Sequence, residues 1–203
     1  MPKFLNRPVL VANISAGSWG PPNMLAYVKE FGFFDADVIV VVLSSHDYGD
    51  VPTFSPLNPT THPIESPRLA LGEGITRYLP RYLPWSPKLT GIPYVPPPSL
   101  EDTQAAMAAL KTFLRLANTN VNNVQVFLHW TKSEVATGSA EIGNTRIFEL
   151  CREESIEAHQ LGPIYLMALK SGTNPYRDDI HPNEIGQRVL AEALLKQLDR
   201  TRR

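Results

Sequence analysis

The feature that most constrains the fold is an apolar, β-branched run at residues 37–43, Asp-Val-Ile-Val-Val-Val-Leu. Both faces of such a run are apolar, as in an interior strand of a parallel sheet that helices cover on both sides. The segment Val124–Leu128 has the same character. Between the two lies a helical pattern over Leu100–Leu116, with Asp102 placed to cap its start. A strand, a helix and a second strand in this order predict a parallel β-α-β unit.

The rest of the chain extends the alternation. We predict further strands at 9–14 and 163–167, and further helices at 22–31, 145–160 and 182–198. This order predicts an α/β fold with a parallel sheet covered on both faces, in one domain spanning residues 1–203. Sites in such sheets lie at the carboxyl ends of the strands. Residues 13–18, 44–47, 129 and 178–181 all fall there.

Residues 51–98 break this pattern. They hold 12 of the 19 prolines, and the stretch is too long for an ordinary connection. A disordered linker is one interpretation, and an ordered Pro-rich excursion over the strand ends, forming one wall of the site, is the other. The aromatic content favours the ordered excursion; the aromatic residues are Phe54, Tyr78, Tyr82, Trp85 and Tyr94.

Composition excludes several classes of function. The net charge of −1 gives no general attraction to nucleic acids or anionic membranes. No apolar run reaches the roughly 18 residues of a membrane span. Cys151 is the single cysteine, so no intrachain disulfide can form, and its helical surroundings predict a core residue. We expect a soluble protein, cytoplasmic as the sequence stands and exported if its amino terminus is incomplete.

The motif richest in chemistry lies near the end of the chain. Asp178 precedes His181 by three residues, and Pro182 and Asn183 follow, where a loop gives way to the last helix. Proline is tolerated in the first helical turn, so His181 is expected directly before the start of the helix. A carboxylate on one ring nitrogen leaves the other free to act as a general base toward a nucleophile. The alternative is a helix-start aspartate beside a surface histidine.

The longer string at residues 178–191, Asp-x-x-His-Pro-Asn-x-x-Gly-x-x-x-x-Ala, resembles the last block of the SGNH (GDSL-like) hydrolases. These are esterases and acyl-transfer enzymes with a three-layer, flavodoxin-like fold. The resemblance implies that fold here, with His181 as general base and acid and Asp178 as its orienting partner. It covers nearly the whole chain, through three blocks of the family's four.

Two earlier segments carry the rest of the resemblance. Residues 13–21, Asn-Ile-Ser-Ala-Gly-Ser-Trp-Gly-Pro, are similar to the second block, which implies a backbone N–H for the oxyanion near Gly17. Residues 44–47, Ser-Ser-His-Asp, are similar to the third, where His46 replaces the usual asparagine donor and Asp47 follows. His129 ends a strand on the same side. It is expected either to line the pocket or to be a loop residue before a helix.

The block that carries the nucleophile, Gly-Asp-Ser, is missing from this sequence. Two explanations compete. In the first, the chain lacks an amino-terminal βα unit, and exposed apolar strand edges then predict a homodimer or aggregation. Alternatively, Ser15 or Ser18 is the nucleophile of a rearranged first block. Because Ser18 aligns with a backbone-donor position, we expect little turnover from the chain as given.

The sequence therefore predicts an SGNH-type serine ester hydrolase or O-acyl-transfer protein, acting on a small-molecule or carbohydrate ester such as an acetyl group. The alternative is a noncatalytic SGNH-like domain that binds a ligand or partner. We expect no cofactor, because no zinc-type Cys/His spacing and no phosphate-binding glycine motif is present. A metal held by His46, Asp47 and Asp50 with the residues at 178 and 181 is a minor alternative, and we expect no metal.

Overall fold

The structure, a computed structural model, describes residues 9–17, 19–52, 69–75, 79 and 97–200; for 199 and 200 it describes the backbone. Three strands form one parallel sheet in the order β1-β2-β3. They are β1 (Val38–Ser44), β2 (Asn123–His129) and β3 (Glu157–Gln160). Each residue of β1 pairs with one of β2, from Val38 with Asn123 to Ser44 with His129. The predicted α/β class with a parallel sheet is confirmed.

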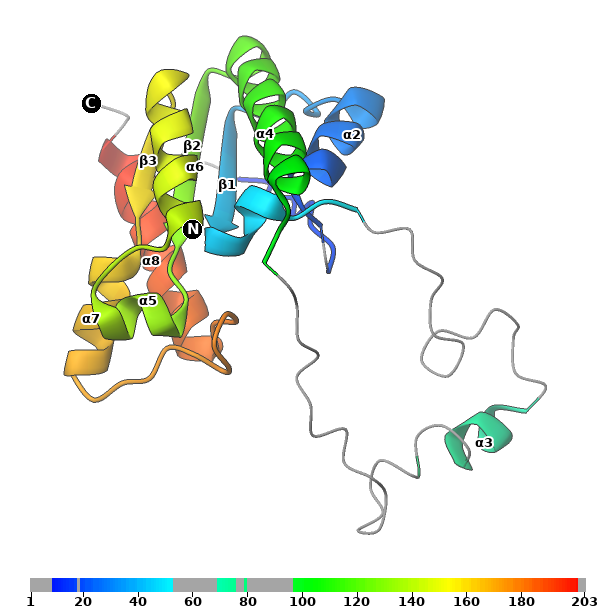
Figure 1. Cartoon of the computed structure of the whole chain (residues 1–203), viewed down its shortest axis with the longest axis vertical. Coiled ribbons are helices and arrows are strands. Elements are labelled where there is room, and N and C mark those ends of the chain that lie inside the picture. Colours follow the sequence, from blue (N-terminus) through cyan, green and yellow to red (C-terminus); the bar gives the residue numbers. More distant parts are fainter. Residues whose placement is uncertain (1–8, 18, 53–68, 76–78, 80–96, 201–203) are drawn as a thin grey trace. The chain divides into compact units, whose positions relative to one another are not determined.

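Helices lie on both faces of the sheet. The face toward α2 (Pro21–Phe31), α4 (Leu100–Asn120) and α6 (Ile142–Glu153) holds the larger core. In Figure 1, α4 and α6 lie in front of the strands. The opposite core draws on α5 (Lys132–Thr137), α7 (Gly162–Lys170) and α8 (Glu184–Arg200). Alternate residues of β2 separate the two cores, because side chains on a strand point to opposite faces.

Local signals explain where the helices begin. The Ser99 hydroxyl accepts from the backbone N–H of Asp102, and the Asp102 carboxylate accepts from the Ser99 N–H at 3.1 Å, a capping box for α4. The predicted helix is confirmed and runs to Asn120. The predicted helix at 22–31 is also confirmed, and it starts one residue earlier, at Pro21. The last predicted helix begins at Glu184.

The prediction of a strand at 9–14 is wrong. These residues are described, form no strand and are largely exposed, with Leu10 95% accessible. β-Branched residues favour a strand only where a neighbouring strand pairs with them and side chains on the same face pack against them. Here β1 makes its ladder with β2, and the described residues add no strand to its other edge.

Two predictions after residue 144 are also wrong. The helix expected over 145–160 ends at Glu153, and Ser155, at a φ of +55°, turns the chain into β3. His159, which falls within the helix predicted over 145–160, therefore lies on a strand, with its ring centroid 4.6 Å from that of Phe127. The strand expected at 163–167 is the helix α7, because Pro163 occupies the first turn of a helix.

β1 also differs from the interior strand that its sequence predicts. One face is buried at Val41 and Leu43, whereas Val38, Val40 and Val42 remain 37–43% exposed. Within the described residues it is an edge strand of the sheet, as β3 is on the other side. The cause is the coverage of the sheet, since the core formed with α5, α7 and α8 includes Phe127 of β2 and no residue of β1.

Residues Thr53–Pro97 form a second compact unit, distinct from the unit that contains the sheet. Its described part holds the short helix α3 (Ala70–Glu73). The predicted Pro-rich excursion matches this unit in extent, and the five aromatic residues on which that prediction rests lie outside the described residues. Among the residues that the structure describes, no helix is long and apolar enough to cross a membrane.

Candidate functional site

The carboxyl ends of β1 and β2 meet at one edge of the sheet. Ser44, the last residue of β1, pairs with His129, the last residue of β2. The 3-10 helix η1 (Ser45–Gly49) follows β1 directly. The loop before α8 reaches the same edge, because the Ile180 carbonyl lies 2.8 Å from Nε2 of His129. Three of the four segments predicted at this edge are therefore brought together there.

The sequence around Asn183 shapes this loop. Its side-chain Oδ1 accepts from the backbone N–H groups of Ile185 and Gly186, which caps the start of α8. Its amide nitrogen donates to the Asn174 carbonyl at 2.8 Å, which closes the loop. Glycine is required at position 186 because the backbone there packs closely on residue 175. A Cβ at Gly186 would lie 2.2 Å from the Pro175 carbonyl oxygen. The Pro-Asn-x-x-Gly spacing is thus a packing requirement of the loop.

Asp178 and His181 form the predicted pair. Nδ1 of His181 lies 3.0 and 2.9 Å from the two carboxylate oxygens of Asp178. Because a carboxylate only accepts, Nδ1 carries the hydrogen and Nε2 of a neutral ring is the basic atom. Nε2 has no partner among the described residues, and the side chain is 55% exposed. The predicted hydrogen-bonded pair is confirmed, while its catalytic role stays a prediction.

The Asp178 carboxylate is strongly stabilised in its charged form. It accepts from the backbone N–H of His181 at 2.7 Å and from that of Ile180 at 3.0 Å. The N–H of His181 is the largest cause that lowers the pKa of Asp178 to about 2, and the imidazole adds to it. The Arg177 guanidinium lies 3.6 Å away on the outer side. Asp178 therefore stays ionised at neutral pH and can stabilise an imidazolium at His181.

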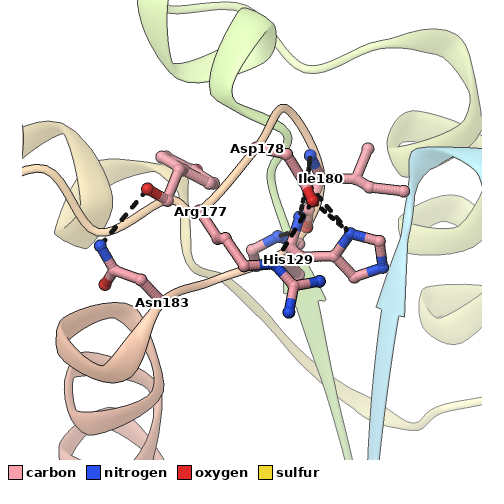
Figure 2. Close-up of polar contacts among 7 residues, drawn as sticks. His129, Arg177, Asp178, Ile180 and Asn183 are labelled. Carbon is pink, nitrogen blue, oxygen red and sulfur yellow. Dashed lines mark hydrogen bonds and ion pairs between the residues drawn. The ribbon is translucent and has the colours of Figure 1, made fainter. Parts of the chain in front are cut away.

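His129 lies beneath this loop and is buried. The carbonyl of Ile180 only accepts, so Nε2 of His129 carries the hydrogen, and Nδ1 accepts from the Tyr165 hydroxyl at 3.2 Å. Figure 2 shows His129 beside the loop that carries Asp178 and Ile180. Burial lowers the pKa of His129, and the Ile180 carbonyl opposes this effect. In this arrangement both ring nitrogens of His129 are engaged within the protein.

Glu134 is a buried residue of this edge that sequence reasoning missed. Its carboxylate, 1% exposed, accepts from the backbone N–H groups of Thr131 and Glu141 and from the Asn144 amide, each at 2.7 Å. The Ser45 hydroxyl also approaches it, at 3.4 Å. Glu134 thereby ties the chain after β2 to η1 after β1. The sequence signal was the capping box of α5, with Thr131 three residues before Glu134.

His46 and Asp47, predicted to bind the oxyanion or substrate, lie on η1. The Ser44 hydroxyl donates to the Asp47 carboxylate at 3.0 Å, so toward His46 Nδ1, 2.8 Å away, it acts as an acceptor. Nδ1 of His46 therefore carries the hydrogen, and its Nε2 can donate to an oxyanion only when the ring is protonated. Asp47 also accepts from the Ser44 N–H, which makes it the capping-box partner of Ser44, the N-cap of η1.

A cation would find its ligands at the same place. His46, Asp47 and Asp50 offer three ligand atoms within 4.8 Å of one another. Among the described residues, this is the group of acidic and histidine side chains that could hold a metal ion. Burial is the largest cause that raises the pKa of Asp50, and the neighbouring Asp47 charge adds to it. Asp47 is already engaged as a cap, so the cluster is explained without an ion.

The turn predicted to carry the oxyanion donor and nucleophile precedes α2. Gly17 lies in an exposed turn, and Gly20 packs so closely on Asp50 that a Cβ would meet the Asp50 carbonyl oxygen at 2.3 Å. The Ser15 hydroxyl donates to the Asn13 side chain at 2.8 Å. Ser18 lies outside the described residues. No serine hydroxyl in the described part of the chain is hydrogen bonded to His181.

A hollow of about 620 Å³ in the sheet-containing unit lies away from these residues. It is bounded by the end of α2, by Phe33–Asp35 before β1 and by Leu116 and Asn120 of α4, at the amino end of the strands. Ligands of parallel sheets bind at the carboxyl ends, where the pair of Asp178 and His181 stands.

Comparison of the chain with protein-family models, with curated proteins and with solved structures found no match.

Proposed function

We propose that the protein is an SGNH-type ester hydrolase or O-acyl-transfer protein with a flavodoxin-like fold. The observation that carries the proposal is the pair of Asp178 and His181, placed at the carboxyl edge of a parallel sheet with Nε2 of His181 open to solvent. An exposed imidazole whose other nitrogen is held by an ionised carboxylate is suited to general acid–base catalysis. Small-molecule or carbohydrate esters are the substrates that this chemistry serves.

In the proposed reaction Nε2 of His181 removes the proton of a serine hydroxyl while the serine oxygen attacks the ester carbonyl carbon. Asp178 stabilises the imidazolium that forms. Collapse of the tetrahedral intermediate expels the alkoxide, which takes the proton from Nε2. Water, or an acceptor alcohol in transfer, then attacks the acyl-enzyme with the same proton movements. The backbone N–H of Gly17 is the proposed oxyanion donor, a contact typically worth about 3–4 kcal/mol of barrier.

The nucleophile decides between this proposal and its alternative. The candidates are Ser15, whose hydroxyl donates to Asn13, and Ser18, which lies outside the described residues. The alternative function is a noncatalytic SGNH-like domain that binds a ligand or partner. The observation in its favour is that no described serine is hydrogen bonded to His181.

A fluorophosphonate probe and p-nitrophenyl acetate test the proposal. Stoichiometric labelling of Ser18, lost in Ser18→Ala and in His181→Ala and retained in Ser15→Ala, would establish the hydrolase. His181→Ala should abolish hydrolysis and change the free energy of unfolding by about 0.5 kcal/mol or less, since the side chain is exposed. Absence of both labelling and turnover in the wild-type chain would favour the binding domain.

We also propose that a second copy of the chain covers β1. The strand Val-Ile-Val-Val-Val-Leu-Ser has no charge or proline to protect the edge on which no described strand pairs with it. Two copies paired antiparallel about Val41 would bring no like charges opposite one another and would keep the exposed valines of both on one face. The net charge of −1 adds little repulsion.

A further inference from the structure

We infer that His129 is a positioning residue, which holds the peptide unit between Ile180 and His181 and thereby sets the geometry of the Asp178–His181 pair. The inference rests on the proposed function for the chemistry that the pair performs. Its test below uses the geometry of the pair and needs no turnover.

The Ile180–His181 peptide unit is bound on both sides. Its carbonyl, that of Ile180, accepts from Nε2 of His129 at 2.8 Å. Its N–H, that of His181, donates to Oδ1 of Asp178 at 2.7 Å. One planar group therefore lies between a buried imidazole and the exposed carboxylate. A bonded carbonyl also polarises the N–H of the same unit, which strengthens the donation to Asp178.

The preceding peptide unit is bound in the same way. The Asp179 carbonyl accepts from the backbone N–H of Lys132 at 2.7 Å, and the Ile180 N–H donates to Asp178 at 3.0 Å. Both N–H groups that donate to the Asp178 carboxylate thus belong to peptide units whose carbonyls are held by the last residue of β2 and by the segment that follows it. His129 is the side chain in this arrangement, and the other anchor is backbone.

The tautomer of His129 follows from its contact with Ile180. The carbonyl only accepts, so Nε2 carries the hydrogen, and Nδ1 of the neutral ring accepts from the Tyr165 hydroxyl. The rings of Tyr165 and Tyr176 enclose the imidazole, with centroids 5.2 and 5.9 Å away. A neutral ring of fixed tautomer is thereby held at the end of a buried strand.

The chain offers a matched control at Tyr176. Its hydroxyl donates to the Trp130 carbonyl at 2.7 Å, so it anchors the same loop to the same segment without touching the Ile180–His181 unit. Tyr176→Phe removes that anchor and keeps the ring. Any shift at Asp178 that exceeds the shift in Tyr176→Phe reports the peptide unit rather than a general loosening of the loop.

The experiment is NMR titration of the Asp178 carboxyl in the full chain. In His129→Leu the pKa of Asp178 should rise from about 2 toward its ordinary 3.8. In His129→Gln, which restores an N–H donor, and in Tyr176→Phe it should stay low. An equal shift in His129→Leu and Tyr176→Phe would overturn the inference.

A measurement on the wild-type protein tests the same inference if His129→Leu does not fold. The ¹⁵N shifts of the His129 ring at pH 7.5 should report a neutral imidazole protonated at Nε2. A ring protonated at Nδ1 alone would overturn the inference, because Nε2 would then carry no hydrogen to donate to Ile180.

Discussion

β1 and β2 are alike in sequence and differ in environment. Both have seven residues, run parallel and pair along their whole length. β2 is buried from Val124 to His129 on both faces, whereas β1 exposes Val38, Val40 and Val42. Apolarity on both faces of a strand therefore does not ensure that two layers cover it. The difference also marks the face of the sheet that the other described residues of its unit leave partly exposed, at Val38, Val40 and Val42.

The strongest test of this difference in burial truncates one apolar side chain on each strand. Phe127→Ala removes a fully buried ring from β2 and should lower the free energy of unfolding by about 3–5 kcal/mol. Val42→Ala on the exposed face of β1 should lower it by roughly 0.5 kcal/mol. Urea unfolding measures both. A cost at Val42 near that at Phe127 would mean that this face of β1 is covered in solution.

The second test addresses the tie between the two strand ends. Glu134→Gln places an amide N–H₂ against donors that the carboxylate now satisfies, which should cost about 2 kcal/mol. The exposed Glu149→Gln, which loses a surface ion pair with Arg146, should cost about 0.5 kcal/mol or less. Thermal unfolding compares the two variants, and similar losses would show that Glu134 is no more than a surface carboxylate in effect.

A third, smaller effect depends on pH through His129. Burial lowers its pKa from 6.5, so near and below pH 6.5 the unfolded chain binds more protons than the folded chain. Stability is therefore complete above pH 6.5 and declines as the pH falls below it. The unfolding free energy of His129→Gln, measured from pH 7.5 to 5.5, should decline less steeply than that of the wild type. Parallel slopes would contradict a buried, neutral His129.

The smallest expected effect on stability comes from charging the open face of β1. The double variant Val40→Lys, Val42→Lys should change the unfolding free energy of the monomer by about 1 kcal/mol or less. It should nevertheless convert a dimer to a monomer in light scattering, because two pairs of lysines would meet across the paired strands. Met167→Lys, at an exposed site on α7, is the control and should leave the dimer intact. A wild-type monomer at all concentrations would remove the proposal of a second copy.

Much of the site could be predicted from sequence because its signals are local. The Asp178–His181 spacing, with Pro182 and Asn183 at a helix start, specifies a pair and a helix cap whose own hydrogen bonds span three residues or fewer. Strands β1 and β2 and helix α4 followed from periodicity in the same way. Cys151 is buried as its helical surroundings predicted, and burial raises the pKa of its thiol to about 12.

Tertiary contacts decided the rest. The apolar composition of residues 9–14 does not form a strand without a ladder, and the sequence alone carries no sign of which edge is free. β3 forms from Glu157–Gln160 because β2 pairs with it, although its residues favour no strand. The role of His129 depends on Ile180, 51 residues away, and that of Glu134 on Asn144 and Ser45. Local sequence determined which groups this protein carries, and the packing of distant segments decided which of them are buried, bonded or free.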